Sequence, residues 1–488
     1  MTEVDRVSWR GMAGVVLLFF ALGVPQLLFV APTVPEDEPR HAGYALEVAS
    51  GRLPLVTEPL PTERLGIPPL KRTNIMAAAN HPPLYYALVG PFIRWGSETG
   101  HHELGLRLAR AATLAMGAVG LIYAFVTIRL LVPNRPAAAV ATVACVAAMP
   151  AFINVCALVH NDALAVMTAS GFGYAVARWL VADDRSRRQL GVLSAWAAAV
   201  ALTRFSGLLV LAPFIALLGL GTAYKAAGSW PRRLAQGAFP VVVVVAVVAV
   251  TSGWFYARNY VLYDDVTGGK ALFGVLARKP HGTLWSALWA PAVWSGLHDH
   301  IWTRLAGSVH LGASVQAAGR LWTFLGVVGL VRYAIAAPRL VRAIPPRDLR
   351  AWTLAASAAA FGVIVLSVFA FYARGGNPTA RYWFPMAWVP MLVVSLGWSG
   401  LHRRAGMAVG VVLSVVLSGH VLLLYANVLL AGGRVLRDFA TVRAAGGGPT
   451  EWIAPIALLG VAVALVAVVD AILTLEATTS AGTGRTAA

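Results

Sequence analysis

Three carboxylates directly follow the first apolar segment of the chain. Residues 35–41 read PEDEPRH, so Glu36, Asp37 and Glu38 stand at the start of a short helical pattern that ends near Ser50. Asp37 could act only as a cap for that helix, because aspartate side chains accept hydrogen bonds at helix N-termini. A carboxylate at a helix N-terminus also stays ionised and can take a proton from a bound hydroxyl. The residues alone leave both interpretations open.

Two further polar groups interrupt apolar sequence. Residues 80–86 read NHPPLYY, in which two prolines set the start of a short amphipathic helix, and residues 160–162 read HND between two apolar runs. The tyrosines could be interfacial anchors and Asp162 a second helix cap, or these groups could contact a substrate. The candidate site residues here are His81, Tyr85, Tyr86, His160, Asn161 and Asp162.

Several arginines stand beside the carboxylate cluster or near the ends of apolar runs. They are Arg40, Arg204, Arg258, Arg374 and Arg381, and Asn259 and Tyr382 follow two of them directly. Guanidinium groups bind phosphate bidentately, so these arginines could hold a phosphate at a membrane surface. Ion pairs with Asp37, Asp162 or Asp264 are the alternative.

Metal and cofactor signals are weak. The segment from His298 to His300 reads HDH, but its spacing matches no zinc signature, so we assign no metal-ligating residues and leave a divalent metal open. Cys145 and Cys156 can form neither a disulfide framework nor a thiolate metal cluster. The chain lacks a P-loop, a Rossmann glycine fingerprint and a G-x-S-x-G elbow, which argues against nucleotide-driven chemistry.

The elements that must position these residues are membrane helices. The chain has 488 residues, of which 58% are hydrophobic and only 12% charged, and its mean hydropathy is +0.70. Soluble domains have about 25% charged residues. This composition excludes an ordinary soluble enzyme, a disordered protein and a free nucleic-acid binder. Apolar runs long enough to cross the hydrocarbon layer recur throughout, which predicts an all-α polytopic membrane protein.

Twelve spanning runs are predicted. They fall at about 11–31, 107–132, 137–157, 161–181, 189–203, 205–224, 235–257, 319–338, 350–372, 382–400, 404–430 and 452–475. The stretch His81–Trp95 is short and carries three prolines, so we expect it to lie in the interface. Residues 1–400 would form the catalytic module, 401–476 the C-terminal membrane helices, and 477–488 a disordered tail.

Basic residues predict the orientation. With twelve spans, the positively charged loops share one side with both termini, and positive loops face the cytoplasm. The loop residues are Arg135, Arg185, Arg187, Arg188, Lys225, Arg232, Arg233, Arg339, Arg342, Arg347, Arg350, Arg403 and Arg404. Two long loops, 32–106 and 258–318, then face outward, and the tryptophans of the second suit the head-group level. The net charge of +18 reflects this orientation or binding of anionic lipid.

The order of these motifs resembles the GT-C superfamily of membrane glycosyltransferases, in particular the protein-mannosyltransferase and aminoarabinose-transferase-like group. The resemblance covers about residues 10–400. Its elements are the Asp-Glu pair at 37–38, SGRLP at 50–54, HPPLYY at 81–86, Asn-Asp at 161–162, WFYARNY at 254–260 and ARYWFP at 380–385.

The resemblance implies transfer of a sugar from a polyprenyl-phosphate donor to a glycan, lipid or protein acceptor, with inversion, at the outer face of a bacterial plasma membrane. It implies that Asp37 is the catalytic base, that Glu38 is its neighbour in the motif, and that Asp162 is the acidic residue of a later outer loop. In aminoarabinose transferases a lysine stands where this chain has His81, so His81 could contact phosphate, the acceptor or a metal.

Two other classes remain open at this stage. A lipid-carrier flippase or transporter would carry charges within its spans, and a scaffold would use Asp37 and Asp162 only as caps. Apart from Arg204 and Asp470, the spanning runs carry few charges and most charged residues cluster on one face of the membrane, which favours interfacial chemistry. The enzyme hypothesis requires that Asp37, Asp162, Arg258 and Arg381 meet in one cavity.

Overall fold

The computed structural model describes residues 2–30, 37–70, 74–302, 304–305, 309–310, 312–343, 348–399, 405–430 and 453–484. Its long helices are α1 (Glu3–Phe29), α4 (His102–Leu131), α5 (Pro136–Ala147), α6 (Pro150–Ala157), α7 (Asp162–Leu180), α8 (Arg187–Ala201), α9 (Phe205–Lys225), α10 (Trp230–Tyr263), α14 (Gly312–Ala343), α15 (Leu349–Ala373), α16 (Trp388–Trp398), α17 (Gly406–Leu430) and α19 (Ile453–Gly484). The shorter elements are α2 (Glu38–Ala49), η1 (Ala77–Asn80), α3 (Leu84–Thr99), α11 (Gly269–Val275), α12 (Leu284–Leu288), α13 (Pro291–Trp302), η2 (Ala380–Met386) and the two-residue strands β1 (Arg304–Leu305) and β2 (Val309–His310).

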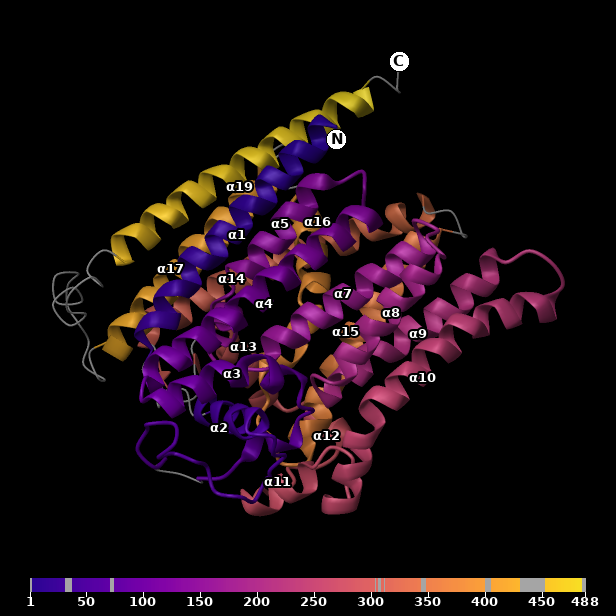
Figure 1. Cartoon of the computed structure of the whole chain (residues 1–488). Helices are drawn as coiled ribbons and strands as arrows, with labels where there is room; N and C mark the ends of the chain where they lie inside the picture. Colours follow the sequence, from indigo (N-terminus) through magenta and orange to yellow (C-terminus); the bar gives the residue numbers. More distant parts are fainter. Residues whose placement is uncertain are drawn as a thin grey trace.

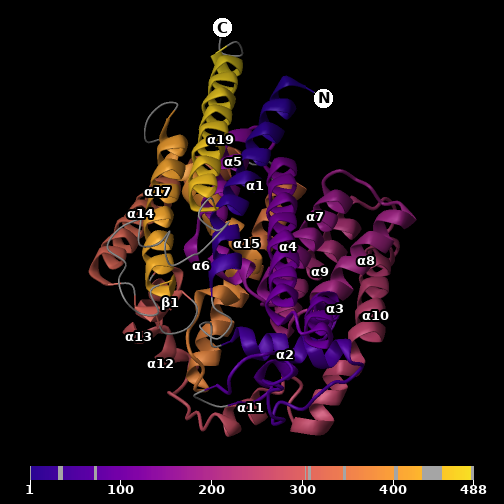
Figure 2. The ribbon, with the colours of Figure 1, turned by 60° about the vertical axis from the view of Figure 1, so that its left-hand side comes forward.

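The long helices form a bundle with two different ends. Both termini lie at one end, whereas α2, α11 and α12 lie at the other, which we call the loop end (Figure 1). The second view shows the same division (Figure 2). The two long loops predicted to face outward therefore gather at the end opposite the termini.

Among the described residues, eight helices are long and apolar enough to cross a membrane, and the bent pair of α5 and α6 adds a ninth. This confirms an all-α polytopic membrane protein. Every one of the twelve predicted runs contains a helix. Three of these helices, α7, α8 and α16, do not meet the length and hydropathy expected of a membrane-spanning helix. The number of spans therefore stays a prediction.

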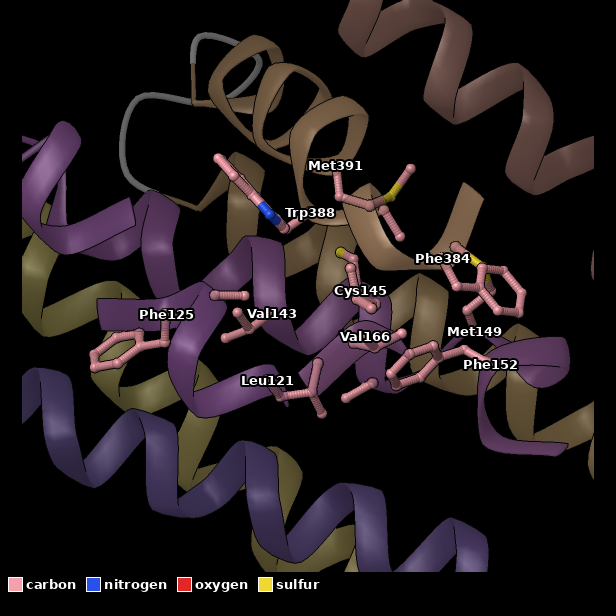
Figure 3. Packing of buried hydrophobic residues seen from close by; sticks show 14 of the residues in the cluster. Leu121, Phe125, Val143, Cys145, Met149, Phe152, Val166, Phe384, Trp388 and Met391 are labelled. Atoms are coloured by element: carbon pink, nitrogen blue, oxygen red, sulfur yellow. The ribbon is translucent and has the colours of Figure 1, made fainter. Parts of the chain in front are cut away.

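The bundle is built around α5. All of its residues are buried, and Figure 3 shows Val143 and Cys145 packed near Phe152, Phe384 and Met391 from other elements. The run predicted as one span over 137–157 is two helices that meet at an angle of 65°. Pro150 opens the second of them, because proline starts helices readily but cannot continue one.

The segment predicted to lie in the interface forms α3, which is amphipathic. It buries Val89 and Ile93 and exposes Leu88, Phe92 and Trp95. Tyr85 and Tyr86 are fully buried in protein, so their interpretation as interfacial anchors was wrong.

The C-terminal helix extends further than the predicted run, because α19 continues to Gly484. The tail predicted to lack structure from residue 477 is therefore helical as far as this residue. Residues 485–488, Glu36, Arg347, Arg403 and Arg404 lie outside the described residues, as do the side chains of Arg339, Arg342 and His310.

Candidate active site

A cavity of about 1430 Å³ opens at the loop end of the bundle. Its wall comes from segments far apart in sequence, namely the start of α2, η1, α6, α9, α11, the end of α15 and η2. Its charged and histidine side chains nearest to α2 are Asp37, Glu38, Arg40, His41, His81, His160, Arg204 and Arg381.

Asp37 lies immediately before α2, and its side chain makes no capping hydrogen bond to that helix. Arg381 Nη1 instead donates to its Oδ2 at 2.7 Å, and Arg40 Nη1 lies 3.5 Å from its Oδ1. The side chain keeps 44% of its exposure, because it faces the cavity. The interpretation of Asp37 as a plain helix cap was therefore wrong.

Arg381 connects the polar residues of the cavity. Besides Asp37, it donates from Nη1 to His160 Nε2 at 3.0 Å, and its Nε lies 3.9 Å from Asp162 Oδ2. It reaches the site through η2, which begins at Ala380 after α15 has ended. One guanidinium thus contacts groups from α2, from the turn before α7 and from α7 itself.

Asp162 is fully buried beneath the cavity wall and does not line it. Its carboxylate forms an ion pair with Arg204, and His160 Nδ1 lies 3.1 Å from its Oδ2. The helix that it starts, α7, has Asn161 as N-cap without a side-chain cap hydrogen bond. Asp162 therefore holds Arg204 and His160 in place from behind the wall.

Burial shapes the charge of the site. Desolvation opposes the negative charge of Asp37, but the charge of Arg381, the facing His160 and His41 and the hydrogen bond from Arg381 together hold the pKa of that carboxyl well below its usual range. Burial lowers the pKa of Arg204 to about 10, and Arg204 still remains a cation at neutral pH. Its guanidinium also stacks over the Tyr382 ring, 5.0 Å from the centroid.

Three histidines form a row of rings along the wall. The centroids of His41 and His160 are 4.2 Å apart, and those of His41 and His81 are 6.0 Å apart with nearly parallel planes. Desolvation holds the pKa of each ring well below its ordinary value. The three rings are therefore neutral at physiological pH.

The inner charges do not cancel. Two aspartates, Asp37 and Asp162, form ion pairs with three arginines, Arg40, Arg204 and Arg381. Glu38 is not counted here, because Arg110 neutralises it. The surplus of one positive charge in this group at the cavity suits an anionic ligand such as phosphate.

Two predicted phosphate or substrate contacts lie away from the cavity. Arg258 Nη2 donates to the carbonyls of Leu53 and Pro54 at 2.9 and 3.0 Å, and neither Arg258 nor Asn259 lines the wall. Asn259 Nδ2 donates to the carbonyl of Asn80 at 3.3 Å. Both side chains tie α10 to the first long loop, so the expected meeting of Arg258 with Asp37 was wrong.

Three more predicted contacts are internal. The hydroxyl of Tyr85 lies 2.7 Å from Thr113 Oγ1, and that of Tyr86 lies 2.8 Å from His41 Nδ1. Asn161 Nδ2 donates to the Thr203 carbonyl at 3.4 Å. None of the three lines the cavity, and Tyr86 contacts the lining residue His41.

The remaining predicted residues do line the cavity: Arg40, His81, His160, Arg374, Arg381, Tyr382, Asp37 and Glu38. Sequence reasoning did not assign His41 to the site, and it considered Arg204 only as one of several arginines that could bind phosphate or form an ion pair. The signal for Arg204 was a charge between two apolar runs, and the signal for His41 was its place one helical turn after Asp37.

The described residues contain no group of three or more histidine, cysteine, aspartate or glutamate side chains that could hold a metal ion. In the HDH segment, His298 Nδ1 lies 3.5 Å from Asp299 Oδ1, and His300 lines the cavity. These residues do not fit the ligand set of a resident divalent ion.

Comparisons with known proteins agree with this fold. Residues 80–256, less than half of the chain, match the family model described as dolichyl-phosphate-mannose-protein mannosyltransferase. The structure is similar to that of ArnT from Cupriavidus metallidurans bound to undecaprenyl phosphate, with a TM-score of 0.50 and 18% identity over 98% of this chain and 76% of that one.

More distant similarities carry no further argument. AglB from Archaeoglobus fulgidus, in complex with an inhibitory peptide and a dolichol-phosphate, gives a TM-score of 0.43 at 13% identity, over 98% of this chain and 56% of AglB. The Pmt1-Pmt2 complex of S. cerevisiae bound to the sugar donor gives 0.37 at 14% identity, over 55% of this chain and 36% of that one. No curated protein sequence matches the chain.

The family model and the ArnT fold together confirm the resemblance to the GT-C membrane glycosyltransferases, in the mannosyltransferase and ArnT-like group.

Proposed function

We propose that the protein transfers a sugar from a polyprenyl-phosphate donor to an acceptor hydroxyl at the extracytoplasmic face of a bacterial plasma membrane. The observation that carries this proposal is the ionised Asp37 beside a surplus of arginines in one cavity at the loop end. The undecaprenyl phosphate in the ArnT structure and the mannosyltransferase family model support the donor class.

The proposed reaction is a single inverting displacement. The acceptor oxygen attacks the anomeric carbon and loses its proton to Asp37, while the bond from that carbon to the phosphate oxygen breaks on the opposite face. The electron pair of that bond stays with the phosphate. Arg381 and Arg204 stabilise the charge that develops there, and Arg40 and Arg374 lie along the same wall.

Arg381 has two tasks in this scheme. It pairs with Asp37 and helps to keep this carboxyl ionised. A phosphate bound to Arg381 competes for the same guanidinium, which loosens the ion pair and leaves Asp37 as a stronger base. His81, neutral and set in the wall, would contact the sugar or the acceptor rather than hold the phosphate by charge.

A flippase is the competing function. It would need a route for the lipid head group through the bundle, and it would need no group to take a proton. The charged cluster instead gathers at the loop end around Asp37. This arrangement favours chemistry at one membrane surface over translocation.

The test is the Asp37→Asn variant. Without a base, the rate of transfer from a radiolabelled polyprenyl-phosphate sugar should fall by about 10²- to 10⁴-fold, while the folded yield stays normal. Asp183→Asn, the same change at an exposed loop at the opposite end, is the matched control and should retain activity. Full transfer by Asp37→Asn would remove Asp37 from the role of base. Carrier translocation without any transfer by the wild type would favour the flippase.

A further inference from the structure

A buried arginine on α4 joins three separate segments behind the active site. Arg110 is 2% exposed, and its Nε and Nη2 donate to the two carboxylate oxygens of Glu38 at 2.7 and 2.5 Å. Its Nη1 donates to the carbonyls of Leu27 and Val30 at 2.9 and 2.7 Å. The guanidinium therefore holds the C-terminal end of α1 and the start of α2 at the same time.

Glu38 extends the same contacts to a third segment. Its Oε1 also accepts a hydrogen bond from the backbone N–H of Val159 at 2.9 Å, and the residue is 1% exposed. With Arg110 Nε, Arg110 Nη2 and this amide, both oxygens of the carboxylate have partners. We call Arg110 and Glu38, with their three backbone partners, the α4 clamp.

Two residues of the α4 clamp lie next to residues of the cavity site. Glu38 is the neighbour of Asp37, and Val159 is the neighbour of His160. Arg381 then bridges Asp37 and His160, at 2.7 and 3.0 Å. The clamp thus fixes the backbone next to Asp37 and next to His160, the two residues that Arg381 contacts.

Helix α4 also contacts the segment that carries His81. Thr113 follows Arg110 by three residues, so the two side chains share a face of α4. The Thr113 hydroxyl lies 2.7 Å from that of Tyr85, in the first turn of α3 directly after His81 and the two prolines. One face of α4 therefore supports the segments that carry Asp37, His160 and His81.

A buried ion pair is a poor source of stability, because desolvation of both charges offsets their attraction, whereas its fixed geometry can specify an arrangement. Resting on the proposed function, we infer that Arg110 and Glu38 are positioning residues that hold Asp37 and His160 in register for transfer. Glu38 then does not take a proton itself, since its oxygens are occupied.

The test replaces the pair together, as Glu38→Gln with Arg110→Met, so that no unpaired charge remains buried. A small displacement of a catalytic group costs about 10²-fold in rate. We expect kcat to fall by about that factor, with the donor KM and the pH profile of kcat unchanged. Arg110→Lys keeps the charge but loses the bidentate contact, and should give an intermediate kcat.

A second readout does not depend on activity. The amides of Arg40 and His41 each donate to the Asp37 carbonyl at 3.1 Å. Their hydrogen exchange should become faster in the double variant while the thermal midpoint of the whole protein stays close to that of the wild type. The matched control is Arg10→Met with Asp470→Asn, an exposed pair between α1 and α19 with a 2.5 Å contact, which should change neither readout.

Three outcomes overturn the positioning role: wild-type kcat in a folded double variant, unchanged exchange at Arg40 and His41, or a shifted pH profile that makes Glu38 a proton carrier. If the wild type transfers no sugar but the exchange of these amides accelerates as expected, the proposed function fails and the clamp stands. The two failures are therefore distinguishable.

Discussion

At the scale of single residues, Asp37 shows what a local motif can and cannot reveal. Its place after an apolar run, in a chain with few charges, made it a candidate site residue, and the resemblance to GT-C enzymes implied the role of base. Its partner Arg381 lies 344 positions away, and no local pattern links the two. The sequence therefore predicted the carboxylate, whereas the fold was needed to find what keeps it ionised.

Arg258 is a residue for which the sequence suggested a role that the structure does not support. An arginine at the end of an apolar helix suggested a phosphate contact, but backbone carbonyls of the first long loop satisfy it. Helix-end residues and loop carbonyls occur in every membrane protein, so residue type alone could not separate the two roles. Arg110 was missed although the chain places it within a predicted span, where an ionisable residue is costly and therefore informative.

The histidine row predicts how stability depends on pH. In the unfolded chain, histidines take up protons near pH 6.5. In the folded protein, desolvation holds the pKa of His41, His81 and His160 well below that value, so the unfolded state binds more protons as the pH falls. The free energy of unfolding should therefore rise with pH up to about 6.5 and level off above it.

Thermal midpoints measured between pH 7 and pH 5 check this prediction. In that window each histidine lowers the free energy of unfolding by up to about 1.4 kcal/mol for each unit by which the pH falls. His41→Gln should make the acid loss of stability shallower, and His101→Gln, an exposed site, controls for the loss of a histidine. An equally steep loss in the His41→Gln variant would contradict the assignment.

At the scale of elements, apolar runs located the helices but not their breaks. Hydrophobicity does not change at Met149, so 137–157 read as one span, although Pro150 marks the bend. The bend matters for the site, because α6 and the turn after it supply Asn154, Leu158 and His160 to the cavity wall.

The close contact between α2 and α3 predicts that the protein is sensitive to substitution of Gly90. A Cβ at Gly90 of α3 would lie 2.4 Å from the Ala45 carbonyl oxygen of α2, and backbone cannot yield as a side chain can. Gly90→Ala should therefore push α2 away and destabilise the protein by about 1–3 kcal/mol. Because α2 begins at the active site, kcat should fall as well.

Gly191→Ala is the matched control, since nothing lies within 4 Å of a Cβ added there on α8. Alanine in an open helical position should leave stability unchanged or raise it by about 0.5–1 kcal/mol. Thermal midpoints of both variants in detergent, together with transfer rates, make the comparison. Equal behaviour of the two glycines would show that the close approach of α2 and α3 is not critical.

At the scale of the whole molecule, the division into two ends predicts labelling from the two sides of the membrane. Both termini lie opposite the loop end (Figure 1), and Cys145 and Cys156 are buried, so the native thiols are shielded. A cysteine in place of Thr99, the exposed last residue of α3, should react with an impermeant maleimide in intact cells.

A cysteine in place of Ser229, in the exposed turn between α9 and α10, should react only after the membrane is permeabilised. The basic residues of the loops at this end predict a cytoplasmic location. Reversed accessibility of the two positions would turn the cavity toward the cytoplasm and contradict the proposed location of transfer.

The bridge that Arg381 makes has a consequence for the order of events. This guanidinium contacts Asp37 and His160 together. A carboxylate that shares its lone pairs with a guanidinium is a weaker base than a free one. Under the proposed function, a carrier phosphate that binds Arg381 would deliver the sugar and weaken this contact in the same step. Activation of the incoming hydroxyl would then be coupled to binding of the donor.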